Sequence, residues 1–526
     1  MNWNRNRKVT ERWFIEGALE LVTPTSLSNG DDDPLVDLPV VVDPLDGRAL
    51  LTGASLAGAL RAYLADFSNE HANALFGGER RDREGEQSPL IVEDALGTSE
   101  TLLIELRDGV SIDPATRTAK DKERYDRQLL AAGTKFALGF ELIIAENPDA
   151  KEEDKAKRKA EIARMKAGLA LALQGLQDGK IRLGGRKRRG YGECRVTGWR
   201  AWRYDLGTAN GIRGWLAHDR PGISGQEPPW EPKAGESISH WDALKDVGGL
   251  PLENPLFELT ANFAIDGAVL IRHGFEAESG PDVMHLTTRR DGKDNVPVIS
   301  GTSLAGVIRG QALRIARTVA EPNRDRADAF IEEMFGIMEK PTEDMSLPKR
   351  RGLKKIAGRV RVDESKIEGQ TDLVQTRVKI DRFTGGAFES ALFAEQPAFG
   401  GGFTMKLAIR PLLPPKPPAN PEELTPEKQA EYADKMKAHK ARQDAEAGLM
   451  LLVLKDLWTG FLPVGGSSSV GRGRLKGRWA TIQSDNDVWK LEANGDSLAV
   501  TSKNGAKPKV LNDYVTAFTN AMKESS

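Results

Sequence analysis

Two strand-like runs of apolar residues, at 12–30 and 255–274, open similar stretches of the chain, and each run ends in polar and glycine residues. Lysine- and glutamate-rich segments at 150–176 and 421–458 predict long helices later in each stretch. The pattern in each half is strand, loop, helix, strand, hairpin, strand, long helix, glycine loop and strand. Strands and helices mixed in this order favour an α+β fold with a ferredoxin-like sheet and helices on one face.

A short motif is repeated after each opening run. GASLAGALR at 53–61 and GTSLAGVIRG at 301–310 are identical at six of their first nine positions. Ser55 and Ser303 are of a residue type that caps helix N-termini, so we expect the helices to begin near them. Apolar residues at helical spacing predict the buried face of the first helix, namely Leu56, Leu60 and Leu64.

The repeated order predicts a duplication of one domain. We place the first domain at 1–198 and the second at 253–480, followed by a C-terminal extension at 481–526. The linker at 199–252 contains five tryptophans among prolines and glycines. Because a tryptophan carries a large apolar surface, we expect this linker to pack on protein rather than to hang free.

Composition and charge narrow the class of protein. The formal net charge is -2 and the pI about 6.4, so a polyanion would have to bind at local basic patches. One such patch lies at 349–361 and another in LGGRKRRGYG at 183–192. The single cysteine, Cys194, excludes an internal disulfide and a cysteine-built zinc site. No membrane span and no secretion signal is recognisable, so we expect a cytoplasmic protein.

The two glycine loops, at 183–192 and within LPVGGSSSVGRGR at 462–474, indicate anion binding. Glycines permit positive backbone dihedral angles, and successive amides in such turns bind anions. A Walker loop is excluded because Gly190 is followed by Tyr191, and these loops run from helix to strand, unlike a dinucleotide fingerprint. A nucleic-acid backbone is therefore the better ligand. The alternative is that 186–189 is only a solvated basic turn.

These motifs together resemble the RAMP superfamily, in particular the backbone subunits of type III CRISPR interference complexes. The stretches that carry the resemblance are 36–61, 107–136, 183–192, 301–310 and 376–393. The resemblance implies two tandem RAMP domains, each ferredoxin-like with inserted helices and a thumb hairpin, in an arrangement similar to type III-D. It also implies a guide RNA, a complementary target RNA, other RAMP-containing subunits and a large polymerase-like subunit as partners.

The resemblance further implies that the helix starts and glycine loops bind the guide-RNA backbone and that the thumbs displace nucleotides. Family members usually carry lysine where this chain has Ala57 and Ala305, which predicts fewer phosphate contacts there. Phe383 and Phe388 of the second thumb either stack on bases or pack at the hairpin base. The residues expected to bind RNA are Ser55, Arg61, Gly184, Gly185, Arg186, Lys187, Arg188, Arg189, Gly190, Ser303, Arg309, Phe383, Gly465, Gly466, Ser467, Ser468, Arg472 and Arg474.

Cleavage of RNA can use its own 2'-hydroxyl as the nucleophile once the linkage is held in line. The resemblance assigns Asp37 as the catalytic carboxylate, acting with a hydrated Mg²⁺ or another divalent cation. In the second half we favour Asp282, with His285 as an acid, a base or a strand cap, and Asp294 as a third choice. The alternatives are a guide-RNA scaffold without catalysis and a metal-independent endonuclease that processes guide precursors.

Overall fold

The computed structural model describes most of the chain. The described residues are 8–28, 37–78, 87–113, 116, 118–218, 257–273, 280–338, 355–412, 415, 425–484, 487–494, 497–503 and 509–523. Two of the linker tryptophans, Trp230 and Trp241, and residues 349–354 of the basic patch lie outside them. Among the helices that the structure describes, none is long and apolar enough to cross a membrane.

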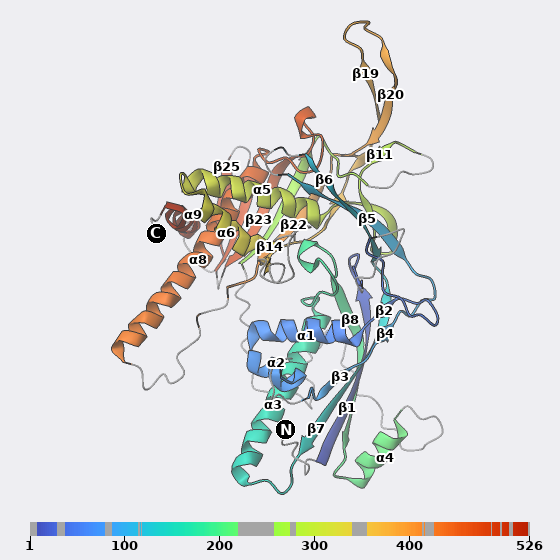
Figure 1. Cartoon of the computed structure of the whole chain (residues 1–526), viewed down its shortest axis with the longest axis vertical. Helices are drawn as coiled ribbons and strands as arrows, with labels where there is room; N and C mark the ends of the chain where they lie inside the picture. The colour runs from blue at the N-terminus through green and yellow to red at the C-terminus, as the bar shows by residue number, and fades with distance from the viewer. Residues whose placement is uncertain are drawn as a thin grey trace, which may run out of the picture.

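The first domain is a four-stranded antiparallel sheet with the strand order β3-β7-β1-β8. The strands are β1 (Lys8–Leu21), β3 (Leu90–Val92), β7 (Lys135–Glu146) and β8 (Cys194–Asp205). The helices are α1 (Gly53–Phe67), α2 (Asn69–Phe76) and α3 (Glu152–Gln177), which lie on one side of this sheet in Figure 1. Leucines of α1 and α3 share one buried core with the strands.

The second domain repeats this topology element by element. Its strands are β9 (Phe257–Asp266), β16 (Val360–Val362), β22 (Gly402–Ile409) and β23 (Arg474–Ser484), in the order β16-β22-β9-β23. Its helices are α5 (Gly301–Ala320), α6 (Arg324–Phe335) and α8 (Pro426–Trp458). An antiparallel sheet in which the last strand pairs with the first is the ferredoxin-like arrangement, so the predicted α+β fold and the duplication are confirmed.

The helices α1 and α5 begin two residues before the predicted caps. The caps are Thr52 and Ser300, whose hydroxyls accept the backbone N–H of Ser55 and Ser303. Ser55 and Ser303 are therefore not N-caps; they stand in the first turn. A side chain at Gly53 would collide with the Val92 carbonyl at 2.1 Å, which explains the glycine that opens α1.

Elements beyond the predicted domain limits join the same cores. Strand β8 continues past residue 198, so Trp199 and Trp202 belong to the first sheet, and α4 (Ala209–Ala217) packs on that strand. In the C-terminal extension, β24 (Asp487–Asn494) and β25 (Ser497–Ser502) lengthen the second sheet. Helix α9 (Lys509–Lys523) buries Phe518 against Phe330, so the extension is part of the second domain's core.

Each domain carries a thumb hairpin. The first thumb consists of β5 (Ile104–Ile112) and β6 (Ala119–Leu130), and the second consists of β19 (Gln375–Ile380) and β20 (Ala387–Gln396). In Figure 1 the second thumb projects away from the body, whereas the first thumb lies beside the second domain. Glu105 of the first thumb accepts hydrogen bonds from the Thr288 hydroxyl at 2.9 Å and the Arg289 amide at 2.8 Å. The first thumb therefore bridges the two domains.

Buried ion pairs fix the contact between the domains, which we call the domain junction. Arg182 binds Asp363 at 2.8 Å, and Arg107 lies 3.4 Å from Glu364. Arg290 of the second domain donates to the Val22 carbonyl at 2.7 Å. Because isolated charges are costly to bury, these pairs hold the two domains in one relative position.

Candidate nucleic-acid interface

A groove of about 300 Å³ joins the start of α1 to the first glycine loop (residues 183–192). Its lining includes Thr52, Ser55 and Gly58 at the helix start. On the loop side it includes Gly184, Gly185 and Lys187. Ser55 and three of the loop residues that the sequence predicted to bind RNA are thus brought together, although more than 120 positions separate them in the chain. The groove is polar and open, as a backbone-binding site requires.

The first glycine loop and the second (residues 464–473) have the same backbone conformation. Arg186 and Ser467 both adopt the left-handed region, at φ of 51° and 59°, and short 3₁₀ turns follow at η1 (Lys187–Arg189) and η4 (Ser468–Val470). The amide of Gly185 donates to the Ser26 carbonyl, and that of Gly466 donates to the Leu270 carbonyl, both at 2.8 Å. These two amides are therefore used within the chain: Gly185 and Gly466 shape the loops and do not donate these N–H groups to a phosphate.

The first glycine loop concentrates positive charge. Arg186, Lys187, Arg188 and Arg189 follow one another, and among the described residues no carboxylate forms an ion pair with them or with Arg309 of α5. Burial lowers the pKa of Arg189, and the neighbouring charges of Arg309, Arg186 and Arg188 lower it further. Burial also lowers the pKa of Lys187 and of Arg188. Cations that repel one another without a counter-charge form a site for a polyanion.

Tyr125 of the first thumb adds an aromatic ring to this cluster, although no sequence motif marks it. The guanidinium of Arg186 lies 4.5 Å from the centre of the Tyr125 ring and donates to its hydroxyl. Arg127 lies 5.2 Å from the same ring. The alternation of side chains along β6 shows only which face of the strand Tyr125 lies on. It does not show that the glycine loop packs beside this strand.

Three other predicted RNA-binding side chains are engaged within the protein. Arg61 donates to Asn73 at 2.9 Å, which ties it to α2. The Ser303 hydroxyl accepts a hydrogen bond from that of Ser300 at 2.8 Å, just as the Ser55 hydroxyl in the groove accepts one from Thr52 at 2.9 Å. Arg472 is 5% exposed and lies 2.9 Å from Glu395, so its charge is already balanced at the base of the second thumb.

The remaining members of the predicted set lie on open surface or in the junction. Ser468, Gly465 and Arg474 are exposed on or next to the second glycine loop. Gly190 is buried, because the second domain covers the first loop at this point. Phe383, at the tip of the second thumb, is 88% exposed, and Phe388 is 46% exposed. Phe383 therefore does not pack at the base of the hairpin, and its ring is available for stacking.

Asp37 and Asp282 occupy equivalent places beside the two thumbs. A carboxylate oxygen of Asp37 accepts the backbone N–H of Asp126 in β6 at 2.9 Å. A carboxylate oxygen of Asp282 accepts the N–H of Ala394 in β20 at 2.7 Å. In each case the next residue pairs in parallel with the thumb strand, Leu38 with Arg127 and Val283 with Glu395. The segment between this aspartate and the following helix is longer in the second domain than in the first. The residue at the same distance before α5 as Asp37 is before α1 is therefore His285 and not Asp282.

His285 has a structural role. It is 6% exposed, its Nδ1 accepts the Ile271 amide at 3.2 Å, and its Nε2 lies 3.0 Å from the Val298 carbonyl. Burial lowers the pKa of His285 to about 4, so the ring is neutral near pH 7. Asp294 pairs with Arg289 at 3.1 Å rather than with the second thumb.

Comparison of the chain with models of protein families identifies its family. The model described as "RAMPs: RAMP superfamily" matches residues 18–195 and again residues 249–476. The chain belongs to the RAMP superfamily. Its two matched regions coincide with the two ferredoxin-like domains, and membership indicates a CRISPR-associated RNA-binding subunit. The comparison with curated proteins gives no match.

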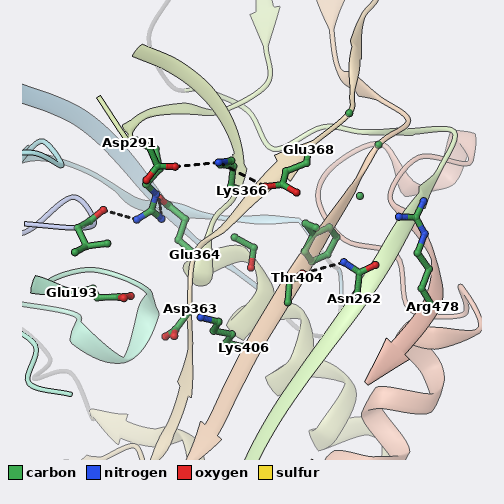
Figure 2. Close-up of a pocket in the computed structure, with 17 residues that line it drawn as sticks. Glu193, Asn262, Asp291, Asp363, Glu364, Lys366, Glu368, Thr404, Lys406 and Arg478 are labelled. Carbon is green, nitrogen blue, oxygen red and sulfur yellow. Dashed lines mark hydrogen bonds and ion pairs between the residues drawn. The ribbon is translucent and has the colours of Figure 1, made fainter. Parts of the chain in front are cut away.

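A second cavity, larger than the groove at the start of α1, lies apart from the candidate interface. It measures about 630 Å³, sits at the domain junction, and contains none of the predicted RNA-binding residues. Figure 2 shows its carboxylates and cations facing one another, with Lys366 bound to Asp291 at 3.1 Å and Asn262 bound to Thr404 at 3.0 Å. Because its charges are largely paired, this cavity has little attraction for a polyanion.

The described residues contain no group of three or more histidine, cysteine or acidic side chains placed to hold a metal ion. Asp37 is exposed, and one of its carboxylate oxygens is held by a backbone amide. Such a carboxylate fits a hydrated Mg²⁺ that is shared with an RNA phosphate, since Mg²⁺ commonly binds through one carboxylate, water and phosphate. It does not fit a metal enclosed by protein ligands alone.

Proposed function

We propose that this RAMP protein is a backbone subunit of a type III CRISPR complex, similar to type III-D, that binds guide RNA and cleaves complementary target RNA. The observation that carries the proposal is the unpaired cationic cluster of the first glycine loop, next to the groove at the start of α1. A path along the groove and the cluster contacts both domains, because Arg309 of α5 in the second domain lies close enough to Arg189 in the first to lower its pKa. The guide-RNA backbone follows this path.

The thumbs and their aspartates supply the proposed chemistry. Each thumb displaces a nucleotide of the guide–target duplex, which leaves the adjacent target linkage free to align for attack. The 2'-oxygen then bonds to phosphorus and the bond from phosphorus to the 5'-oxygen breaks, with the leaving 5'-oxygen taking up a proton from water. The products are a 2',3'-cyclic phosphate and a 5'-hydroxyl. Asp37 and Asp282 each accept the proton of the 2'-hydroxyl, directly or through water. A bound Mg²⁺ would stabilise negative charge on the phosphate.

The chain has two such sites, so we expect two cleavage positions per copy. The partners that we propose beyond the RNA strands are other RAMP-containing subunits and a large polymerase-like subunit, because two domains cover only part of a guide. Target choice follows from base pairing with the guide, as in other RNA-guided complexes.

The test is to purify the assembled complex, add complementary RNA with and without Mg²⁺, and map the cleavage positions. Asp37→Asn and Asp282→Asn should each remove one position and leave RNA binding intact, because each carboxylate serves its own thumb. Asp294→Asn is the matched control, since Asp294 pairs with Arg289. Binding without any cleavage would refute the catalytic part and leave a scaffold. Metal-independent cleavage of free precursor RNA would instead indicate a guide-processing enzyme.

A further inference from the structure

The cavity at the domain junction contains two cations that have no partner. Its volume of about 630 Å³ is in the usual range for a small-molecule site. Lys406 and Arg478 line it and are exposed, and no carboxylate of the described residues forms an ion pair with either side chain. Around them the charges balance closely, since the lining and the side chains that pair with it comprise six carboxylates and seven cations. A small anion can therefore bind there without meeting a surplus of negative charge.

The two free cations flank one point on the outer face of the second sheet, which is the face turned away from the helices. Thr404 and Lys406 of β22 stand on this face, because Met405 between them lies in the core. A side chain at Gly402 would meet the Arg478 guanidinium at 3.2 Å, which places Arg478 over the same strand. Figure 2 shows Lys406 and Arg478 on opposite sides of Thr404. Their side chains can thus contact a single phosphate group from two sides.

A buried hydroxyl in the cavity wall also has no partner. Ser365 is 4% exposed and lines the cavity, and its Oγ forms no hydrogen bond with the described residues. A buried polar atom without a partner costs free energy unless water or a ligand supplies one. Asn262, which donates to Thr404 at 3.0 Å, adds a second polar group to the lining. The cavity thus offers hydrogen bonds as well as charge.

An aromatic ring stands next to these groups. Trp479 of β23 pairs with Asn262 of β9, which in turn pairs with Thr404, so the three side chains form a row across the outer face. Two strand spacings, about 10 Å, separate Trp479 from Thr404. Trp479 is partly exposed, and no ring among the described residues stacks on it. A base can therefore stack on this ring while its phosphate reaches the two cations.

The first domain shows the same face in a covered state. Phe14 and Trp202 pair with each other on the outer face of the first sheet. His218, directly after α4, stacks on Phe14 with ring centres 4.1 Å apart. The Arg12 guanidinium lies 4.8 Å from the centre of the Trp215 ring of α4. The chain itself thus covers the aromatic side chains of the first face, whereas the described residues leave Trp479 of the second face without such a cover.

We propose that this face of the second domain, together with the junction cavity, binds one nucleotide, which is an aromatic base carrying a single phosphate. The phosphate lies between Lys406 and Arg478, and the base stacks on Trp479. A phosphate alone would leave the ring uncovered, and a nucleoside alone would leave both cations without a partner. The inference goes beyond the proposed function, because none of these residues belongs to the guide-RNA path. A free mononucleotide and the 5' end of an RNA strand both present this chemistry.

The test is isothermal titration calorimetry of the full chain with AMP, adenosine, inorganic phosphate and a 5'-phosphorylated adenosine trinucleotide. AMP should bind at least about tenfold more tightly than adenosine or phosphate. Lys406→Gln and Arg478→Gln should each weaken AMP binding at least about tenfold, because each removes a charge-assisted hydrogen bond. Trp479→Leu should weaken AMP binding by a similar factor and leave phosphate binding unchanged. Lys476→Gln is the matched control, because Lys476 also lies on β23 but its ammonium group pairs with Asp266 at 3.3 Å.

The trinucleotide and a photoreactive probe identify the source of the nucleotide and its place on the protein. If the trinucleotide binds at least about tenfold more tightly than AMP, the ligand is the end of an RNA strand. If it binds equally or more weakly, the ligand is a free mononucleotide. A photoreactive azido derivative of AMP should label the peptide that contains Trp479.

Other outcomes would overturn the proposal. Labelling confined to the first glycine loop would place AMP on the guide-RNA path instead. Equal affinities for AMP and inorganic phosphate would show an anion site that takes no base. Loss of AMP binding in Lys476→Gln to the same extent as in Arg478→Gln would show non-specific attraction by charge, and a chain that binds no AMP at millimolar concentration would refute the proposal outright. None of these results bears on the cleavage expected at Asp37 and Asp282, so the proposed function stands or fails separately.

Discussion

Replacing Gly190 with alanine tests whether the two domains are in fixed contact. Gly190 has a φ of 92° and Gly471 a φ of 87°, so alanine at either position suffers the same backbone penalty of about 1–2 kcal/mol. Only at Gly190 does the added methyl group meet a backbone atom, the Glu364 nitrogen at 2.4 Å. The difference between the two variants therefore isolates the cost of the domain contact.

The extra cost at Gly190 follows from what holds Glu364 in place. Its carboxylate is fixed by Arg107 at 3.4 Å and Arg290 at 3.6 Å, and its side chain is fully buried. Making room for a methyl group requires the backbone at Glu364 to move away from the loop, which stretches these pairs. Overpacking of this kind costs about 1–3 kcal/mol. We therefore expect Gly190→Ala to be less stable than Gly471→Ala by about that amount.

The measurement is urea unfolding of the isolated chain, followed by tryptophan fluorescence, for both variants and the wild type. The urea concentrations at the midpoints of unfolding are compared between curves of equal slope. Equal slopes are required because a two-domain chain need not unfold in one step. A lower midpoint for Gly190→Ala than for Gly471→Ala is the predicted result. Identical midpoints would refute the contact between the first glycine loop and the second domain, and with it the composite RNA path across both domains.

Three further predictions concern single residues. Burial raises the pKa of the Cys194 thiol to about 12, so a thiol reagent at pH 8 should modify Cys194 only after unfolding; rapid modification of the native protein would contradict its burial. Burial lowers the pKa of His285 in the folded protein to about 4, whereas its pKa in the unfolded chain is near 6.5. Between these two pH values the unfolded chain binds a proton at His285 and the folded protein does not. Stability should fall by up to about 3 kcal/mol as pH drops from 6.5 to 4, and a His285→Gln variant measured over the same range should show a smaller fall. Arg188→Ala should weaken RNA binding and reduce the slope of log affinity against log salt by about one, whereas Arg200→Ala, which removes a cation bound to Glu16, should leave the slope unchanged.

The duplicated fold was predictable because its signals are local. Six identical positions in the repeated motif, the leucines of α1 and the long charged helices are each visible within a short window of sequence. The exact helix starts were not, because serine at 55 and threonine at 52 are both good caps, and the close contact of Gly53 with the Val92 carbonyl favours the earlier one. That contact joins residues far apart in the chain, and no local pattern encodes it.

The candidate site was predictable in its residue types but not in its partners. The basic residues of the first glycine loop could be read from the sequence, whereas Tyr125 and the second domain's edge reach them only through tertiary packing. Arg472 has the sequence context of an RNA-binding residue, yet Glu395 of the second thumb buries and neutralises it. The equivalence of Asp282 with Asp37 rests on strand pairing, which residue counting misses when loops differ in length.

The most direct test of the central claim is to identify where RNA contacts the protein. The complex is purified with its RNA, irradiated with ultraviolet light, and digested, and the crosslinked peptides are identified by mass spectrometry. We predict crosslinks in the peptide around Tyr125 and in the first glycine loop, residues 183–192. Purified complexes without bound RNA, or crosslinks confined to surfaces away from this loop and the start of α1, would contradict the account.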